Sequence, residues 1–176
     1  GLLAEQVAGT RGARAATGGY LLGTELPLPG GFTLERFIQK MIVGITGMVD
    51  TTVRPKWQVN PPKQPPLVTD NWCAFGIQQI PADANAYVVP NEMGSESTLT
   101  RNEVLQISLS FYGPLGTKNA AALRDGMQLT QNRDVLRTGN IGFTATTEIV
   151  TFNELHGEIW WPRSDMNLIL TRMITK

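Results

Sequence analysis

The chain has 176 residues and a formal net charge of zero, with fifteen Lys and Arg residues against fifteen Asp and Glu residues. This length suits one domain with a single core, with or without an arm. The balanced charge excludes a strongly basic nucleic-acid clamp and an acidic solvating tail. Eighteen glycines and eleven prolines predict abundant irregular and extended backbone.

The first 31 residues are rich in glycine and hold only scattered apolar side chains. Such a segment cannot bury enough apolar area to offset the entropy lost when it orders alone. We therefore predict a Gly-rich extended N-terminal arm over residues 1–31 and a single domain over residues 32–176. A disordered tail is the alternative. The leucines and Tyr20 favour an arm that becomes ordered against neighbouring chains, and Arg11 and Arg14 could meet an acidic neighbour or DNA.

An amphipathic helix is predicted from Thr33 onward. Apolar residues recur there at steps of three and four, with polar residues between them. Thr33 is a good N-cap, and Glu35 suits the positive end of the helix dipole. Gly44 and Gly47 permit a close neighbour, so the helix is expected to pack against a sheet or another helix. The apolar stripe comprises Leu34, Phe37, Ile38, Met41, Ile42, Ile45, Met48 and Val49.

Residues 53–66 read VRPKWQVNPPKQPP. Five prolines remove backbone donors and force the residues before them into extended geometry. This pattern predicts a polyproline-like connector rather than a helix or a central strand. Trp57 is expected to be buried and to hold this strap against the body, although a ligand for an aromatic-lined domain is an alternative.

Period-two alternation begins at Asn71 and predicts strands over residues 72–80, 86–89 and 105–111. Successive strands with short links indicate an antiparallel sheet. Cys73, the only cysteine, lies in the first of these strands. We expect it to be a buried side chain rather than a reactive thiolate.

Two helical segments and two further strands are predicted in the rest of the chain. Thr117 can cap a helix that runs to Met127, and Asn132 can cap a short helix over residues 133–138. Residues 142–152 and 167–174 have strand composition. Residues 158–163 are expected to be a link whose indoles, Trp160 and Trp161, need cover.

The predicted fold class is therefore α/β in the α+β sense. We expect an antiparallel or mixed sheet of about five strands, packed by an N-terminal amphipathic helix and a second helical segment.

No catalytic constellation stands out. His156 is the only histidine, which supports neither a two-histidine metal site nor a Ser-His-Asp triad. With Glu154 and Glu158 beside it, His156 could be a metal ligand or general base, but a partly exposed, hydrogen-bonded loop histidine is the simpler interpretation. The sequence contains no run of 18 apolar residues, so no membrane-spanning helix is predicted. We expect no enzyme activity, no cofactor and no metal.

Several ordered segments carry a resemblance to a known family. They are VRPKWQVNPPKQPP at 53–66, DNWCAFGI at 70–77, SLSFYGP at 108–114, LRDGMQL at 123–129 and QNR at 131–133. Together they resemble the neck or tail terminator proteins of tailed bacteriophages, over residues 34–176.

The resemblance implies a structural virion protein, made in the host cytoplasm, that forms a ring of usually six copies. The ring would join the head connector to the tail tube or sheath, and genomic DNA would pass through its lumen without sequence-specific binding. Acidic and basic residues concentrate in different parts of the chain, which suits head-to-tail contacts in a ring. A stand-alone binding module or minor enzyme that uses Glu154, His156 and Glu158 is the alternative. The residues expected to contact partners are Arg11, Arg14, Tyr20, Trp57, Trp160 and Trp161.

Overall fold

The computed structural model describes residues 13–15, 21–23, 28, 33–56, 68–81, 87–90 and 97–175. Its helices are α2 (Leu34–Thr46), α3 (Gly116–Gly126) and α4 (Thr130–Arg137), with a short 3-10 helix, η3 (Asp50–Thr52). Its strands are β1 (Ala13–Ala15), β2 (Leu21–Gly23), β3 (Val53–Pro55), β4 (Trp72–Pro81), β5 (Tyr87–Pro90), β6 (Ser97–Tyr112), β7 (Ile141–Thr146), β8 (Val150–His156) and β9 (Ile159–Thr175).

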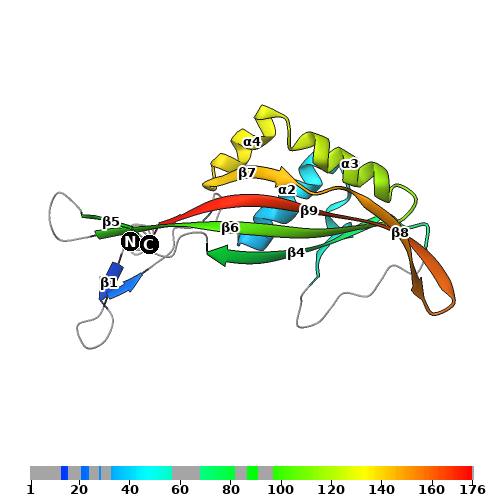
Figure 1. The fold of residues 1–176 in the computed structure, drawn as a ribbon, viewed down its shortest axis with the longest axis horizontal. Coiled ribbons are helices and arrows are strands. Elements are labelled where there is room, and N and C mark those ends of the chain that lie inside the picture. Colours follow the sequence, from blue (N-terminus) through cyan, green and yellow to red (C-terminus); the bar gives the residue numbers. More distant parts are fainter. Residues whose placement is uncertain are drawn as a thin grey trace.

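Strands β3 to β9 form one mixed sheet in the order β3-β4-β6-β9-β7, while β5 pairs with β6 and β8 pairs with β9. The two longest strands, β6 and β9, are antiparallel neighbours from Thr100 opposite Thr175 to Tyr112 opposite Arg163. They form the long axis of the sheet (Figure 1). Only β3 runs parallel to its neighbour in this sheet of described strands, β4. The predicted α+β fold with a mixed sheet is confirmed, with seven strands rather than about five.

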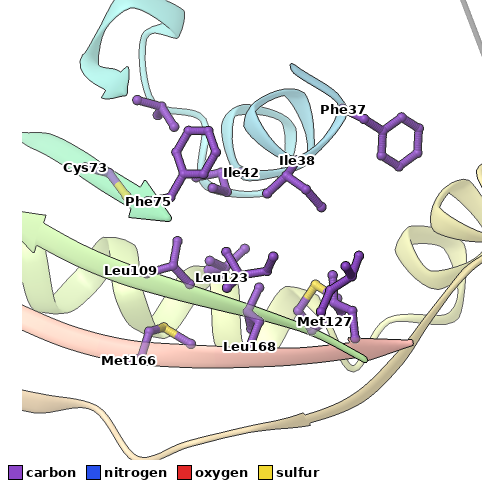
Figure 2. Close-up of a cluster of buried hydrophobic side chains, with 14 of the residues drawn as sticks. Phe37, Ile38, Ile42, Cys73, Phe75, Leu109, Leu123, Met127, Met166 and Leu168 are labelled. Atoms are coloured by element: carbon purple, nitrogen blue, oxygen red, sulfur yellow. The ribbon is translucent and has the colours of Figure 1, made fainter. Parts of the chain in front are cut away.

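The three helices cover one face of this sheet. Alternate residues of β6, namely Leu105, Ile107, Leu109 and Phe111, are at most 1% exposed and belong to one core cluster with residues of α2, α3 and α4. Figure 2 shows Ile38 and Ile42 of α2 packed between the helix and the sheet, near Phe75 of β4. The intervening residues Val104, Gln106, Ser108, Ser110 and Tyr112 lie on the opposite face of the sheet, which we call the open face.

Helix α2 begins where the sequence predicts. The Thr33 hydroxyl accepts a hydrogen bond from the Arg36 backbone N–H at 3.2 Å. The helix ends at Thr46, earlier than the apolar stripe suggested, because Gly47 adopts a left-handed φ of 75° and its N–H donates to the Val43 carbonyl. Val49, which was assigned to the stripe, is therefore outside the helix and 66% exposed.

The two later helices differ from the prediction at their starts. Helix α3 is preceded by Leu115 without a side-chain cap, and the Thr117 hydroxyl bonds to Ser164 instead of capping the helix. Helix α4 starts at Thr130, so Asn132 lies inside it, and the Asn132 amide donates to the Gly126 carbonyl at 2.9 Å. Both polar side chains bond to another segment rather than to their own helix.

The predicted strand over residues 142–152 is two strands, β7 and β8, that lie along the same edge of β9. Thr147 lies between them and remains bonded to Asn167 of β9 through its backbone N–H and its hydroxyl oxygen, at 3.0 and 2.8 Å. The prediction that residues 158–163 form a link is wrong. Residues 159–163 pair with β8 as the start of β9, which satisfies backbone groups there, and Glu158 lies in the turn before them.

Candidate assembly surface

The most prominent surface feature is the β8–β9 hairpin, which extends past the end of β6. Strand β6 ends at Tyr112, opposite Arg163, so residues 159–162 of β9 pair with β8 alone among the described strands. Figure 1 shows this hairpin projecting from one end of the sheet. Gly157 occupies the first position of the two-residue turn with a φ of 62°, a position where type II′ turns require glycine.

Five large apolar side chains of this hairpin are exposed. Cross-strand register places Val150 and Phe152 on the open-face side, and Leu155 opposite Trp160 on the helix side. Both faces of the hairpin are therefore apolar, which is typical of an interaction site rather than of scattered surface residues. We call these five residues the hairpin patch: Val150 (55% exposed), Phe152 (40%), Leu155 (52%), Ile159 (55%) and Trp160 (61%).

A charged network holds the base of the hairpin. The Arg163 guanidinium donates to both oxygens of Asp165 at 2.7 and 2.9 Å and lies 3.2 Å from Glu154 Oε2. The Tyr112 hydroxyl donates to the same Glu154 oxygen at 3.1 Å. Arg163 also lies over the rings of Phe152 and Tyr112, with its Cζ 5.1 and 5.7 Å from their centroids. This network joins β6, β8 and β9 and fixes the direction of the hairpin.

The network is partly shielded from water, and this affects its protonation. Burial raises the pKa of Tyr112 to about 12. Burial acts to lower the pKa of Arg163, but the hydrogen bonds to Asp165 and Glu154 and the nearby negative charge keep that pKa above its ordinary value. Both groups therefore keep their protons through the physiological range.

On the helix side, three hydroxyl groups connect the hairpin to α3. Thr117 Oγ1 lies 3.0 Å from Ser164 Oγ, which lies 3.1 Å from Thr151 Oγ1. On the open face, Trp72 of β4 stacks on Tyr112 with ring centroids 4.2 Å apart. The hairpin is thus fixed to the body from both sides, while its tip remains exposed.

The structure separates the two neighbouring tryptophans that were predicted to contact partners. Trp160 is 61% exposed, whereas Trp161 is 6% exposed and lies opposite Glu154 on β8. Arg14 lies in β1, opposite Leu22 of β2. The remaining predicted contact residues, Arg11, Tyr20 and Trp57, lie outside the described residues.

A second candidate surface is a groove between α2 and α4, which we call the α2–α4 groove. Its volume is about 380 Å³, and Phe37, Met41, Gly44 and Ile45 of α2 line one side of it. Val135 of α4, which is 59% exposed, lines the other side. Sequence reasoning missed this groove because it depends on how α4 packs beside α2. A possible signal was Gly44, which leaves the α2 surface without a side chain at that point.

The residues considered for catalysis, Glu154, His156 and Glu158, do not all lie in one loop as expected. Residues 154–156 are in strand β8. The Glu154 carboxylate forms an ion pair with Arg163 and accepts a hydrogen bond from Tyr112. The side chain of His156 lies outside the described part of the structure. Among the described residues, no group of three His, Cys, Asp or Glu side chains could hold a metal ion. Cys73 is fully buried, and burial raises the pKa of its thiol above the ordinary range.

No described helix is long and apolar enough to cross a membrane. A search of curated proteins gives no match. Residues 33–176 match the model of the family described as phage neck terminator protein. Because this match includes the whole seven-stranded sheet, its three helices and the projecting hairpin, the chain belongs to the phage neck terminator protein family.

Proposed function

We propose that this chain is a structural subunit of a ring in the phage neck that joins the head connector to the tail. The hairpin patch is the observation that carries this proposal. Its five exposed apolar side chains lie on a hairpin that is rigidly held at its base, so little conformational entropy is lost when a partner covers them. Family membership supplies the setting in which such a partner exists.

The ring would contain several copies, usually six, with genomic DNA passing through the lumen. The zero net charge of the chain supports passage without tight binding, because affinity for DNA comes largely from neutralised phosphates. The tail tube or sheath would lie on one side of the ring. The subunit would be made in the host cytoplasm and act only after it is incorporated in the virion.

The N-terminal arm would contact adjacent virion components. Residues 1–31 contain eight glycines together with Arg11, Arg14 and Tyr20, a composition that suits ordering on contact. A chain that starts at Thr33 should keep its α+β circular dichroism but join particles poorly. Normal particle formation by this shortened chain would contradict a docking role for the arm.

Electron microscopy of particles made without this chain tests the main proposal. We expect filled heads and separate tails, with joined particles restored when the chain is supplied in trans. Native mass spectrometry of the isolated neck should give the copy number. Normally joined particles in the absence of the chain would refute the proposed function.

A further inference from the structure

We propose that Leu155 and Trp160, the helix-side members of the hairpin patch, insert into the α2–α4 groove of the neighbouring copy. This inference rests on the proposed ring and identifies the contact that would build it. The contact pairs a projecting apolar element with an apolar hollow of the same chain. Both surfaces are exposed in the single chain.

The patch and the groove lie far apart on one molecule. Helix α4 packs on β7, which pairs with residues 168–172 of β9, whereas the hairpin uses residues 159–162 of the same strand. Ten or so residues of extended chain span about 30 Å, so a hairpin cannot reach the groove of its own copy. Figure 1 shows α4 and the hairpin tip well separated along the sheet. The contact must therefore be made between copies.

A contact between two different surfaces of the same protein has a geometric consequence. Each copy uses its hairpin on one neighbour and its groove on the other, so the chain of contacts continues until it closes on itself. A rotational relation between neighbours closes it as a ring. This is the assembly that the proposed function requires, and a second copy of the same chain is enough to cover the groove and the helix-side members of the patch.

The groove has space for an inserted side chain. Gly44 lies in the lining, and a Cβ built at this position would have no neighbouring atom within 4 Å. The exposed indole of Trp160 or the side chain of Leu155 could fill this space. Aromatic residues that enter pockets commonly contribute most of the energy of an interface.

Charge at the two surfaces is also complementary. Glu158 is exposed in the turn at the hairpin tip, and Lys40 is exposed in the lining of the groove. The approach of the Glu158 carboxylate to Lys40 favours this orientation of docking over one hairpin meeting another. Two hairpins meeting tip to tip would instead bring two Glu158 side chains together.

Cross-linking between engineered cysteines tests the contact directly. Asn153 is exposed beside Leu155 on the helix side of the hairpin, so Asn153→Cys and Val135→Cys are combined in one chain that keeps Trp160. The chain is assembled into particles and treated with a short bis-maleimide. We expect a ladder of covalent multimers that ends at the copy number of the ring. The unmodified chain is the background control, since Cys73 is fully buried.

Three outcomes would contradict the proposed contact or the proposed function. Dimers from Asn153→Cys alone would show that hairpins meet each other, which overturns the proposal. Particles that contain the double variant but yield no multimers also overturn it, while the proposed function stands. Joined particles that lack the chain altogether would refute the proposed function and this inference together.

A filled groove gives a second test that depends on no cross-linker. Gly44→Trp places an indole in the groove, and Gly44→Ala is its matched control. We expect Gly44→Trp to reduce incorporation into particles by about tenfold or more, with an unchanged circular dichroism spectrum. Gly44→Ala should assemble normally. Equal incorporation of both folded variants would overturn the proposal.

Discussion

The two ends of strand β9 have opposite environments. Met166, Leu168 and Leu170 are at most 2% exposed beneath the helices, whereas Ile159 and Trp160 of the same strand are more than half exposed. The buried end belongs to the core of the domain, while the exposed end belongs to the hairpin and contributes little to that core. The comparison teaches that one continuous strand can provide fold stability at one end and a surface for assembly at the other.

The strongest test of this difference between the core and the hairpin is to truncate one large side chain in each region. Phe75→Ala removes a fully buried ring from the core and should lower the free energy of unfolding by about 3–5 kcal/mol. Trp160→Ala should change it by less than about 0.5 kcal/mol but impair particle assembly. Urea unfolding and particle counts measure the two effects. Equal destabilisation by both variants would contradict the division between the regions.

Arg163 joins the two regions, so its removal should have an intermediate effect. Arg163→Met removes the guanidinium that binds Asp165 and Glu154, while Lys56 remains nearby. We expect a loss of about 1–2 kcal/mol of unfolding free energy, since the group is partly exposed. A double-mutant cycle with Asp165→Asn should give a coupling energy well above zero. Additive effects in this cycle would show that the ion pair does not stabilise the hairpin base.

Gly44 inside α2 and Gly47 at its C-cap form a matched pair, which tests how the backbone conformation of a glycine decides the effect of replacing it. Neither has an atom within 4 Å of a built Cβ, but Gly44 is helical and Gly47 has a φ of 75°. Gly44→Ala should therefore stabilise the protein by up to about 1 kcal/mol, and Gly47→Ala should destabilise it by about 1 kcal/mol. Thermal unfolding distinguishes the signs. A shift of the same sign for both variants would contradict this explanation.

The last expected effect depends on pH and is confined to the alkaline range. The pKa of Tyr112 is about 12 in the folded protein, above the ordinary value of about 10 that applies when unfolded. The stability associated with the neutral phenol is complete below pH 10 and is lost as pH rises from about 10 through 12. Tyr112→Phe should flatten this loss in alkaline denaturation curves. An identical pH dependence in both proteins would exclude Tyr112 as the responsible group.

Much of the helix-covered region could be predicted from the sequence because its signals are local. Thr33 marks the start of α2, and alternating side chains mark β4 and β6 before any packing is known. The prediction that Cys73 is a buried strand residue is confirmed for the same reason. Periodicity and capping are properties of a few consecutive residues, so one sequence is enough to reveal them.

The assembly surfaces were harder to predict because they depend on contacts between distant segments. Two adjacent tryptophans and Pro162 obscure the alternation at the start of β9, and only pairing with β8 places one indole inside and the other outside. Gly157 was the available signal, since a glycine between two apolar segments can mark a hairpin turn. Gly44 marks a point on α2 without a side chain, but the groove itself depends on how α4 packs beside α2.

The long antiparallel contact between β6 and β9 also determines how the subunit carries mechanical load. Backbone hydrogen bonds in this pair lie perpendicular to the strands, from Thr100 through Tyr112. A pull along the strands loads all of these bonds together in shear, whereas a pull across them would open the bonds one after another. The sheet should therefore resist extension best along its length, from the helix-covered body to the base of the hairpin.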